Sequence, residues 1–324
     1  MRHQAQRVNG LHHITCIAGP AQENLDFYAG VLGMRLVKKS VNQDDPGTYH
    51  LFYADAAGHP GTDLTFFPWS QMAPAQLGHG LAMEVALEVP GGSLDYWQAR
   101  LTHYGVKLGA AEHRFGEHVL PLVDPHGLRL ALVARTISRS GFAPWERGPV
   151  PTDRQIRGLY GARLWERDAA GTAAFLTEVL GFQPLGTENG WSRYGFPEAL
   201  GVVDLRAVPE GRRGAWGVGS VHHLAWRVDD QAQQREVRAQ VQAAGPRPTD
   251  VIDRFWFKSV YFREPGGVLF ELATDGPGFA VDEDPARLGE TLVLPPWLEA
   301  NRRMIEAVLP PLHLDLPAAT EQAA

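Results

Sequence analysis

The sequence predicts an α+β fold built from four copies of one small unit, followed by a C-terminal helical tail. Each copy reads as a strand, an amphipathic helical stretch that ends on a glycine, and then further strands. The copies recur about every 70 residues, and a repeat of this kind organises the whole fold. The 324-residue chain is long enough for two domains with substantial cores.

The four copies share their landmarks. Their first strands begin at Gly10, Gly80, Gly158 and Gly219, and their helical stretches end at Gly33, Gly105, Gly181 and Gly245. Glycine suits a helix end because it adopts the left-handed conformation without a Cβ penalty. Ser93 is the predicted N-cap of the second helix. Each copy then closes with a strand after a turn, at Pro60-Gly61, Pro125-His126-Gly127, Gly201 and Pro265-Gly266-Gly267.

Aligning the copies predicts where a metal ion binds. In each copy, one position on the first strand and one on the closing strand are candidates for a metal ligand. From the first copy to the fourth, the first-strand position holds His13, Glu84, Gly161 and His223, and the closing-strand position holds Thr65, Ala131, Leu205 and Glu271. The first and fourth copies thus supply two imidazoles and one carboxylate, which form a facial triad that leaves neighbouring coordination positions open. Thr65 stands where a fourth ligand could have been. The second and third copies are not expected to hold an ion.

This placement also predicts how the copies pair. If two copies are needed to surround an ion with a cup-shaped sheet, the first copy must pack against the fourth and the second against the third. The two halves of the chain would then interlock.

Several segments resemble one known family. They are Leu11-His12-His13-Ile14-Thr15, the stretch from Tyr49 to Asp55, the stretch from Pro60 to Phe67, and the stretch from Pro265 to Glu271. From about residue 8 to 280 the chain resembles the vicinal oxygen chelate superfamily, whose βαβββ modules pair into open cups. Within it, the segments look like the ring-cleaving dioxygenases that open hydroquinones. The resemblance implies that His13, His223 and Glu271 bind Fe(II), with Mn(II) as an alternative. It also implies that Thr15, His12, His222, Arg254 and Tyr261 are polar residues of the pocket.

The residues themselves give further expectations for these pocket positions. Tyr261 and Glu271 lie symmetrically about Gly266, so a hairpin that turns there sets them opposite each other on one face. A register slip of one residue would send Tyr261 to the other face. Arg254-Phe255 has a counterpart, Arg114-Phe115, in a copy without metal, so the arginine is equally well explained as part of the repeat.

The histidines beside the predicted ligands are harder to assign. Strand alternation points His12 and His222 away from the metal, so orienting or structural roles are as plausible as substrate contact. His50, His113 and His118 are expected to be ordinary surface or core residues.

Composition narrows the class of protein. A net charge of -7 and the lack of a basic cluster argue against nucleic-acid partners. We expect no membrane partner and a cytoplasmic location, because the first residues lack a signal-peptide core and no apolar run reaches transmembrane length. The single cysteine, Cys16, fits a reducing compartment and a buried position.

The expected domain organisation has four parts: residues 8–137 (modules 1 and 2), a linker at 138–154, residues 155–280 (modules 3 and 4), and a tail at 281–324. Within the tail we expect a helix from about Trp297 to Val308, with Trp297, Met304, Ile305 and Val308 on one apolar stripe. This helix could be a strap, a lid or a dimer contact, and homo-oligomer formation stays open. Disorder is expected from about Pro317.

The expected function is O₂-dependent cleavage of a small aromatic ring, and the resemblance implies that this ring is a hydroquinone. Two alternatives remain. One is a glyoxalase-type metal-dependent isomerase or lyase, against which Thr65 in the fourth ligand position counts. The other is a protein that binds an aromatic compound or a drug without catalysis, although such a protein need not retain three metal ligands in the correct pair of copies.

Overall fold

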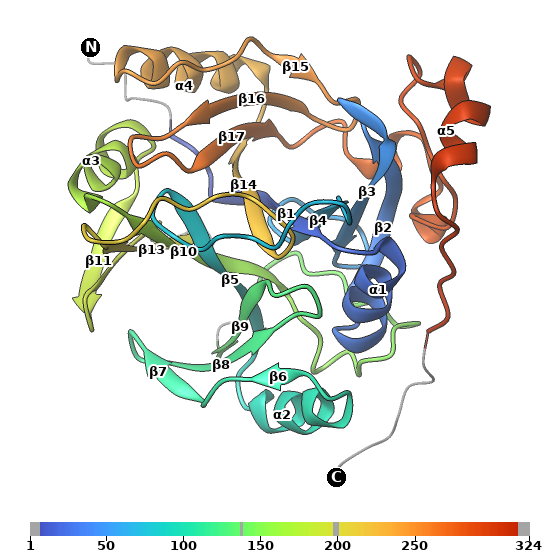
Figure 1. Cartoon of the computed structure of the whole chain (residues 1–324), viewed down its shortest axis with the longest axis horizontal. Coiled ribbons are helices and arrows are strands. Elements are labelled where there is room, and N and C mark those ends of the chain that lie inside the picture. The colour runs from blue at the N-terminus through green and yellow to red at the C-terminus, as the bar shows by residue number, and fades with distance from the viewer. Residues whose placement is uncertain (1–6, 137–138, 197–200, 317–324) are drawn as a thin grey trace.

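The computed structural model describes residues 7–136, 139–196 and 201–316, which form two curled sheets (Figure 1). The first sheet has eight strands, in the order β15 (Ile252–Asp253), β16 (Lys258–Arg263), β17 (Leu269–Thr274), β14 (Ser220–Val228), β1 (Leu11–Ala18), β4 (Asp63–Pro68), β3 (Asp45–Ala54) and β2 (Arg35–Asn42). The second sheet has nine strands. Eight follow the order β11 (Gln183–Glu188), β12 (Trp191–Gly195), β13 (Val202–Ala207), β10 (Gly158–Glu166), β5 (Leu81–Pro90), β9 (Arg129–Arg135), β8 (Glu117–Val123) and β6 (Lys107–Leu108), and β7 (Glu112–Arg114) pairs with β8.

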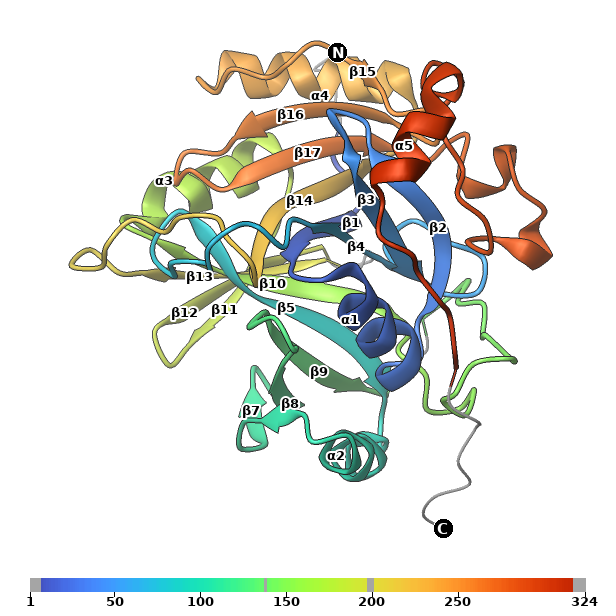
Figure 2. The same ribbon diagram turned by 45° about the vertical axis from the view of Figure 1, so that its right-hand side comes forward.

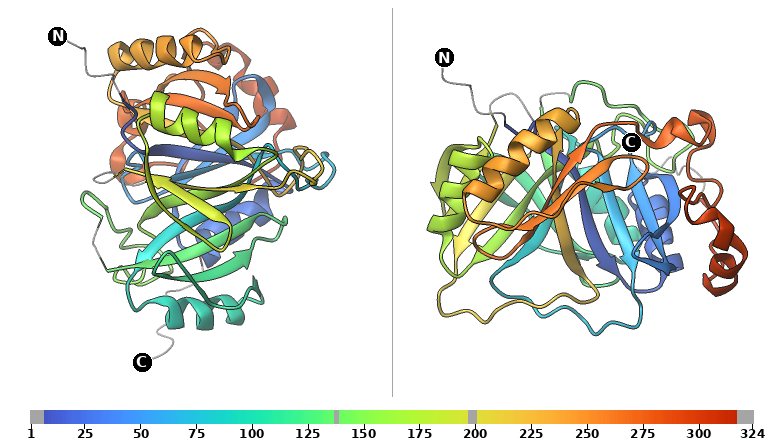
Figure 3. Two further views of the ribbon diagram at one scale, coloured as in Figure 1. Left: turned by 90° about the vertical axis from the view of Figure 1, so that its left-hand side faces the viewer. Right: turned by 90° about the horizontal axis from the view of Figure 1, so that it is seen from above.

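The strand orders confirm the predicted pairing of copies. β1 of the first copy lies antiparallel to β14 of the fourth, and β5 of the second lies antiparallel to β10 of the third. The chain therefore crosses from one sheet to the other between β4 and β5, and returns between β13 and β14. These two connections run side by side (Figure 3), with β-bridges from Pro74 to Val218 and from Gln76 to Ala215. Each half of the chain contributes strands to both sheets.

Each copy carries one main helical segment. These are α1 (Ala21–Leu25), continued by a π-helical turn at Asp26–Val31; α2 (Leu94–His103); α3 (Ala169–Ala174), continued by a π-helical turn at Phe175–Val179; and α4 (Gln231–Ala243). The predicted terminal glycines all have positive φ, between 67° and 113°. Figure 2 shows α4 over β16 and β17, with α2 at the opposite end of the molecule beside β8.

The amphipathic pattern of the first helix is confirmed, because Leu25, Tyr28, Ala29 and Leu32 are all buried. Ser93 is the N-cap residue of α2, as predicted, but its side chain does not cap the helix. Its hydroxyl donates back to the Pro90 carbonyl at 2.6 Å and makes no cap hydrogen bond to the helix. By contrast, Asp230 accepts hydrogen bonds from the backbone of Ala232 and Gln233 at the start of α4.

The apolar core lies mainly between the helices and the outer faces of the sheets. Trp226 on β14 and Phe270 on β17 are fully buried there, with ring centroids 5.2 Å apart. Cys16 is buried, as expected. None of the helices in the described ranges is long and apolar enough to cross a membrane.

The tail differs from its prediction. Its helical part is a 3₁₀ turn at Glu299–Asn301 followed by α5 (Arg302–Val308), outside β3. Of the predicted apolar stripe only Ile305 is buried, against Val41 and Leu294. Trp297, Met304 and Val308 are exposed, because the short helix touches the sheet with a single turn. The disorder expected from Pro317 concerns residues outside those described.

Candidate metal centre

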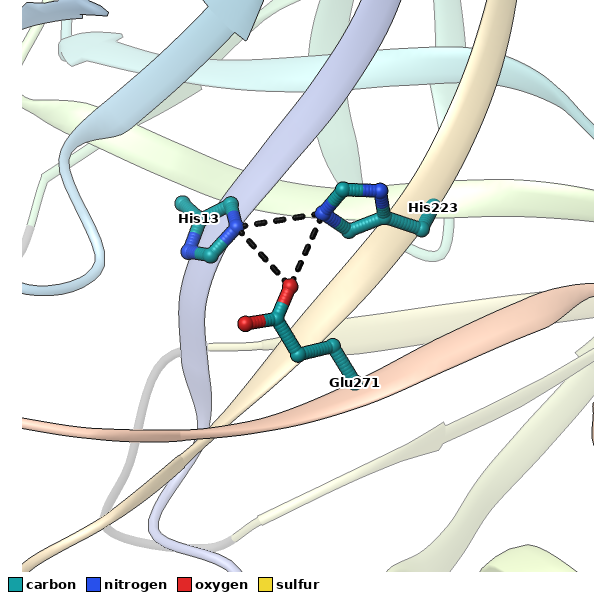
Figure 4. A group of neighbouring side chains, drawn as sticks. All are labelled: His13, His223 and Glu271. Atoms are coloured by element: carbon teal, nitrogen blue, oxygen red, sulfur yellow. Dashed lines mark hydrogen bonds and ion pairs between the residues drawn. The ribbon is translucent and has the colours of Figure 1, made fainter. Parts of the chain in front are cut away.

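The structure brings His13, His223 and Glu271 together at the base of the first cup (Figure 4). The two Nε2 atoms lie 3.2 Å apart, and Glu271 Oε2 lies 3.2 Å from the Nε2 atom of His13 and 2.9 Å from that of His223. All three side chains are buried. Among the described residues, this is the one group of three or more His, Cys, Asp or Glu side chains that could hold an ion.

Strand register explains why these residues converge. β1, β14 and β17 are neighbours, and His13, Ala225 and Glu271 stand in one row across them. His223 lies two residues before Ala225, so it points to the same face of the sheet. The small Ala225 side chain leaves room for the longer ligands on either side.

The donor set fits a metal ion. Two ligand atoms about 2.1 Å from an ion, in adjacent octahedral positions, lie about 3.0 Å apart, close to the distances observed here. Ser259 on β16 donates a hydrogen bond to Glu271 Oε1 at 2.5 Å, which leaves Oε2 buried and without a hydrogen-bond donor. A cation would satisfy this oxygen atom and the two facing nitrogen lone pairs at once.

The neighbouring histidines contact the ligand histidines from behind. His12 Nδ1 lies 2.9 Å from His13 Nδ1, and its Nε2 lies 3.1 Å from the Thr274 carbonyl. His222 Nδ1 lies 2.8 Å from His223 Nδ1. Burial, with a smaller contribution from the adjacent imidazole, lowers the pKa of His12 and of His222 to about 3. Both rings are therefore neutral near pH 7 and can accept the Nδ1 proton of a ligand histidine, which supports the orienting interpretation of these residues.

Tyr261 and Arg254 lie beside the cluster. The register confirms that Tyr261 stands opposite Glu271, and its ring centroid is 5.5 Å from that of His223. The Arg254 guanidinium lies 5.5 Å from the Tyr261 ring centroid and pairs with Asp44 at 2.7 Å. The comparison with Arg114-Phe115 also holds, because Phe115 and Phe255 both have positive φ. Arg254 thus belongs to the repeat and also lines the cavity.

A cavity of about 40 Å³ opens in front of the cluster. Its walls are largely aromatic, and its polar residues come from the β2–β3 turn, from the loop before β16, and from β3 and β16 themselves. The lining residues outside the cluster are Asn42, Gln43, Asp44, His50, Phe52, Phe67, Arg254, Trp256, Phe257 and Tyr261.

Of the site residues that sequence reasoning missed, two bear directly on its chemistry. His50 was expected to be an ordinary surface or core residue, but it lines the cavity. Its Nε2 lies 2.9 Å from Thr65 Oγ1, which in turn lies 2.8 Å from Thr15 Oγ1. Ser259 was not considered at all. Its position two residues before Tyr261, on the same strand face, is the signal that could have identified it.

In the second cup, which the second and third copies form, the structure corrects the sequence alignment at one position. Leu205 was expected at the site position of β13, but it lies in the apolar core, and the neighbouring Asp204 faces the cup instead. Two carboxylates, Glu84 and Asp204, are therefore present. They are paired with arginines: Glu84 with Arg114, and Asp204 with Arg163 and Arg193. These ion pairs occupy the place that corresponds to the metal cluster in the first cup.

Comparison with known proteins identifies the family. A model of the Glyoxalase/Bleomycin resistance protein/Dioxygenase superfamily matches residues 10–132 and 161–272. The chain therefore belongs to this superfamily, which is the class that its paired sheets and buried donor set resemble. Glyoxalase I from Zea mays shares the fold, with a TM-score of 0.60 at 15% identity over 82% of this chain and 92% of that chain.

More similar proteins are dioxygenases by name. The chain is 43% identical to "Putative ring-cleaving dioxygenase MhqO" of Bacillus subtilis (strain 168), over 96% of this chain and 98% of that protein. It is 34% identical to chlorohydroquinone/hydroquinone 1,2-dioxygenase of Sphingobium indicum, over 91% and 94%. The crystal structure of a "putative dioxygenase" from Bacillus subtilis matches with a TM-score of 0.89 at 40% identity, over 97% of this chain and all of that chain. The chain is therefore an enzyme, a dioxygenase of the ring-cleaving type.

Proposed function

We propose that this enzyme uses Fe(II) and O₂ to open the ring of a hydroquinone. The observation that carries the proposal is the buried group of His13, His223 and Glu271 at the base of an aromatic-walled cavity. A redox-inert ion such as Zn(II) cannot pass electrons to O₂, so we assign Fe(II), with Mn(II) as the alternative. The likeness to chlorohydroquinone/hydroquinone 1,2-dioxygenase supports the substrate class.

In this proposal His13, His223 and Glu271 hold the metal. Fe(II) held there would supply open coordination positions for substrate and O₂ and a path for electrons between the two. Burial raises the pKa of Tyr261, so its hydroxyl keeps its proton at neutral pH and can donate that proton to an oxygen atom at the site. The rings of Phe52 and Phe67 offer apolar faces to a flat substrate.

One contact favours a dioxygenase over a glyoxalase-type isomerase. The Thr65 hydroxyl stands in the position of a fourth ligand, yet it is engaged with Thr15 and His50. A site with three protein ligands keeps more positions open for substrate and O₂ than a site with four.

The test is O₂ uptake by protein loaded anaerobically with Fe(II), with Mn(II)-loaded and Zn(II)-loaded protein measured in parallel. We expect hydroquinone to drive O₂ consumption faster than catechol, and Zn(II)-loaded protein to consume none. Faster consumption with catechol would move the enzyme to the ordinary extradiol group. Binding of hydroquinone without any O₂ uptake would contradict the catalytic proposal.

A further inference from the structure

His50 reaches the cavity from the edge opposite the predicted proton donor, Tyr261. It lies on β3 and contacts the rings of Phe52 and Phe67, whose centroids are 3.9 Å and 4.4 Å from its own. These two contacts restrict the rotation of the imidazole ring. Its Nε2 is engaged by Thr65. Within the described chain the structure records no hydrogen bond for Nδ1, and this atom is not among the enclosed polar atoms that lack a partner. Nδ1 is therefore the nitrogen that remains available to a molecule in the cavity.

The hydroxyls of Thr15 and Thr65 determine which ring nitrogen carries the proton. Both threonines are completely buried, so each hydroxyl proton needs an acceptor. Over the described ranges, the Thr15 hydroxyl has one recorded partner, Thr65, and the Thr65 hydroxyl has two, Thr15 and His50.

Only one direction of donation satisfies both protons. Thr15 must donate to Thr65, because it has no other acceptor. Thr65 must then donate to His50 Nε2, because the Thr15 proton already occupies the space between the two oxygens. If Nε2 carried the proton instead, one buried hydroxyl would lose its acceptor, at a cost of about 1–3 kcal/mol. The chain of bonds therefore runs from Thr15 through Thr65 to His50.

We propose that this chain fixes His50 in the tautomer that is protonated on Nδ1, and that His50 donates this N–H to an oxygen atom of the ring substrate. The second part rests on the function proposed above, whereas the first concerns the protein alone. His50 is then a substrate-binding residue, and Thr15 and Thr65 are positioning residues that act through it. Thr65, which the alignment of the copies puts at the position of a fourth metal ligand, instead links Thr15 to His50 in this chain of hydrogen bonds.

The neutrality of the ring is consistent with this role. Burial, with further contributions from His13 and His223, lowers the pKa of His50 well below its ordinary value. The ring therefore carries a single proton at neutral pH, and the position of that proton decides whether the cavity meets a donor or an acceptor.

The tautomer can be tested without turnover. ¹⁵N NMR of histidine-labelled, full-length protein, metal-free and Zn(II)-loaded, distinguishes protonated from bare ring nitrogens, and the His50→Phe spectrum assigns the His50 signals. We expect Nδ1 to be protonated and Nε2 bare. In Thr65→Val the preference for this tautomer should be lost, whereas the control Thr102→Val, at an exposed position on α2, should leave it unchanged. A protonated Nε2 in the wild-type protein would overturn the proposal.

Substrate donation is tested by anaerobic calorimetry of hydroquinone binding to Zn(II)-loaded variants, with metal content measured for each. The amide nitrogen of Asn can replace Nδ1, and that of Gln can replace Nε2. His50→Asn should therefore bind hydroquinone more tightly than His50→Gln, and His50→Phe should lose about 10-fold in affinity, the equivalent of one hydrogen bond. Wild-type affinity in His50→Phe or in His50→Gln would overturn the donor role. If no form bound hydroquinone, the proposed function would fail, while the NMR result would still decide the tautomer.

Discussion

At the scale of single residues, the site depends on a few buried acceptor atoms that face one another and that only a bound cation can compensate. Glu271 Oε2 and the two Nε2 atoms face one another inside an apolar surround, and His12, His222 and Ser259 engage the remaining polar atoms of the three side chains. The ligands are thus oriented before a metal arrives, which reduces the ordering needed on binding.

The first prediction concerns the metal ligands. His13→Ala, His223→Ala and Glu271→Ala should each lose bound iron while the fold remains, because each removes one of three ligands. Metal analysis and circular dichroism of the purified variants check this, with His103→Ala at an exposed position as the control. Stoichiometric iron in any one of the three variants would remove that residue from the proposed site.

The second prediction separates chemistry from metal binding. Tyr261→Phe should keep iron content and substrate affinity but lower kcat by about 10²-fold, the scale expected when a positioned proton donor is removed. Steady-state O₂ uptake and metal analysis measure kcat and iron content. Tyr104→Phe serves as the control, because Tyr104 follows α2 in the second copy, away from the metal centre. Unchanged kcat would refute the proton-donor role.

At the scale of elements, the hairpin of β16 and β17 presents three side chains to the metal position from one face. Ser259, Tyr261 and Glu271 share this face because of the two-residue strand period and the register about the Pro265–Gly267 turn. A shift of one residue would remove all three from the site together.

The third prediction tests this support. Ser259→Ala removes the hydroxyl that donates to Glu271 Oε1, so the carboxylate is held less firmly. Iron affinity should fall about 10–100-fold, the usual effect of losing a partner of a metal ligand. Competition with a chelator of known affinity measures the change, and Ser192→Ala on β12 is the matched control. Wild-type iron affinity in Ser259→Ala would show that the contact does not matter for binding.

The fourth prediction concerns the other end of the same hairpin. Glu166, at the end of β10, is completely buried against the backbone of Gly266, and neither of its carboxyl oxygens has a recorded partner in the part of the chain that the structure describes. Burial and the nearby Glu264 raise the pKa of Glu166 to about 9. The folded state therefore retains a proton that the unfolded chain releases near pH 4.5, so this contribution to stability is lost as the pH rises towards 9.

Glu166→Gln, which imitates the protonated carboxyl group, should flatten the fall of Tm between pH 5 and 9 and raise Tm at pH 8–9. Thermal denaturation of metal-free protein across this range checks the expectation, with the exposed Glu178→Gln as the control. An equal pH dependence in wild type and Glu166→Gln would contradict it.

At the scale of the whole molecule, the cup that holds the cluster is assembled from the two ends of the repeat region. His13 is separated from His223 by 210 residues, yet β1 and β14 are adjacent strands. The two crossing connections at 69–80 and 208–219 are the consequence, because each half of the chain must reach both sheets.

The fifth prediction follows from this interlocking. A fragment that ends near Pro149 retains His13 alone, and one that starts near Thr152 retains only His223 and Glu271. Neither fragment should bind iron tightly, whereas co-expression of the two should restore binding. Metal analysis after co-purification checks this. One iron per chain in the C-terminal fragment alone, with cleavage of substrate, would contradict the proposed site.

The sequence by itself determined those features that depend on the repeat and on local geometry. The four copies, the positive-φ glycines and the pairing of Tyr261 with Glu271 follow from periodicity and from a short hairpin, which involve residues close in the chain. The convergence of His13, His223 and Glu271 was also predictable, because aligned copies occupy equivalent positions in a symmetric fold.

Only the tertiary structure decided the features that depend on one-residue register or on packing between distant segments. Asp204, not Leu205, faces the second cup, and Ile305 is the one residue of the short α5 that is buried. His50 enters the site because β3, β4 and β1 are neighbours. Thr15, Thr65 and Phe52 stand in one row across these strands, and His50, two residues before Phe52, reaches Thr65 from the same face. No periodic pattern in the sequence identifies such residues, because strand alternation gives two faces without saying which of them is which. Only the packing of the sheet decides which face lines the cavity.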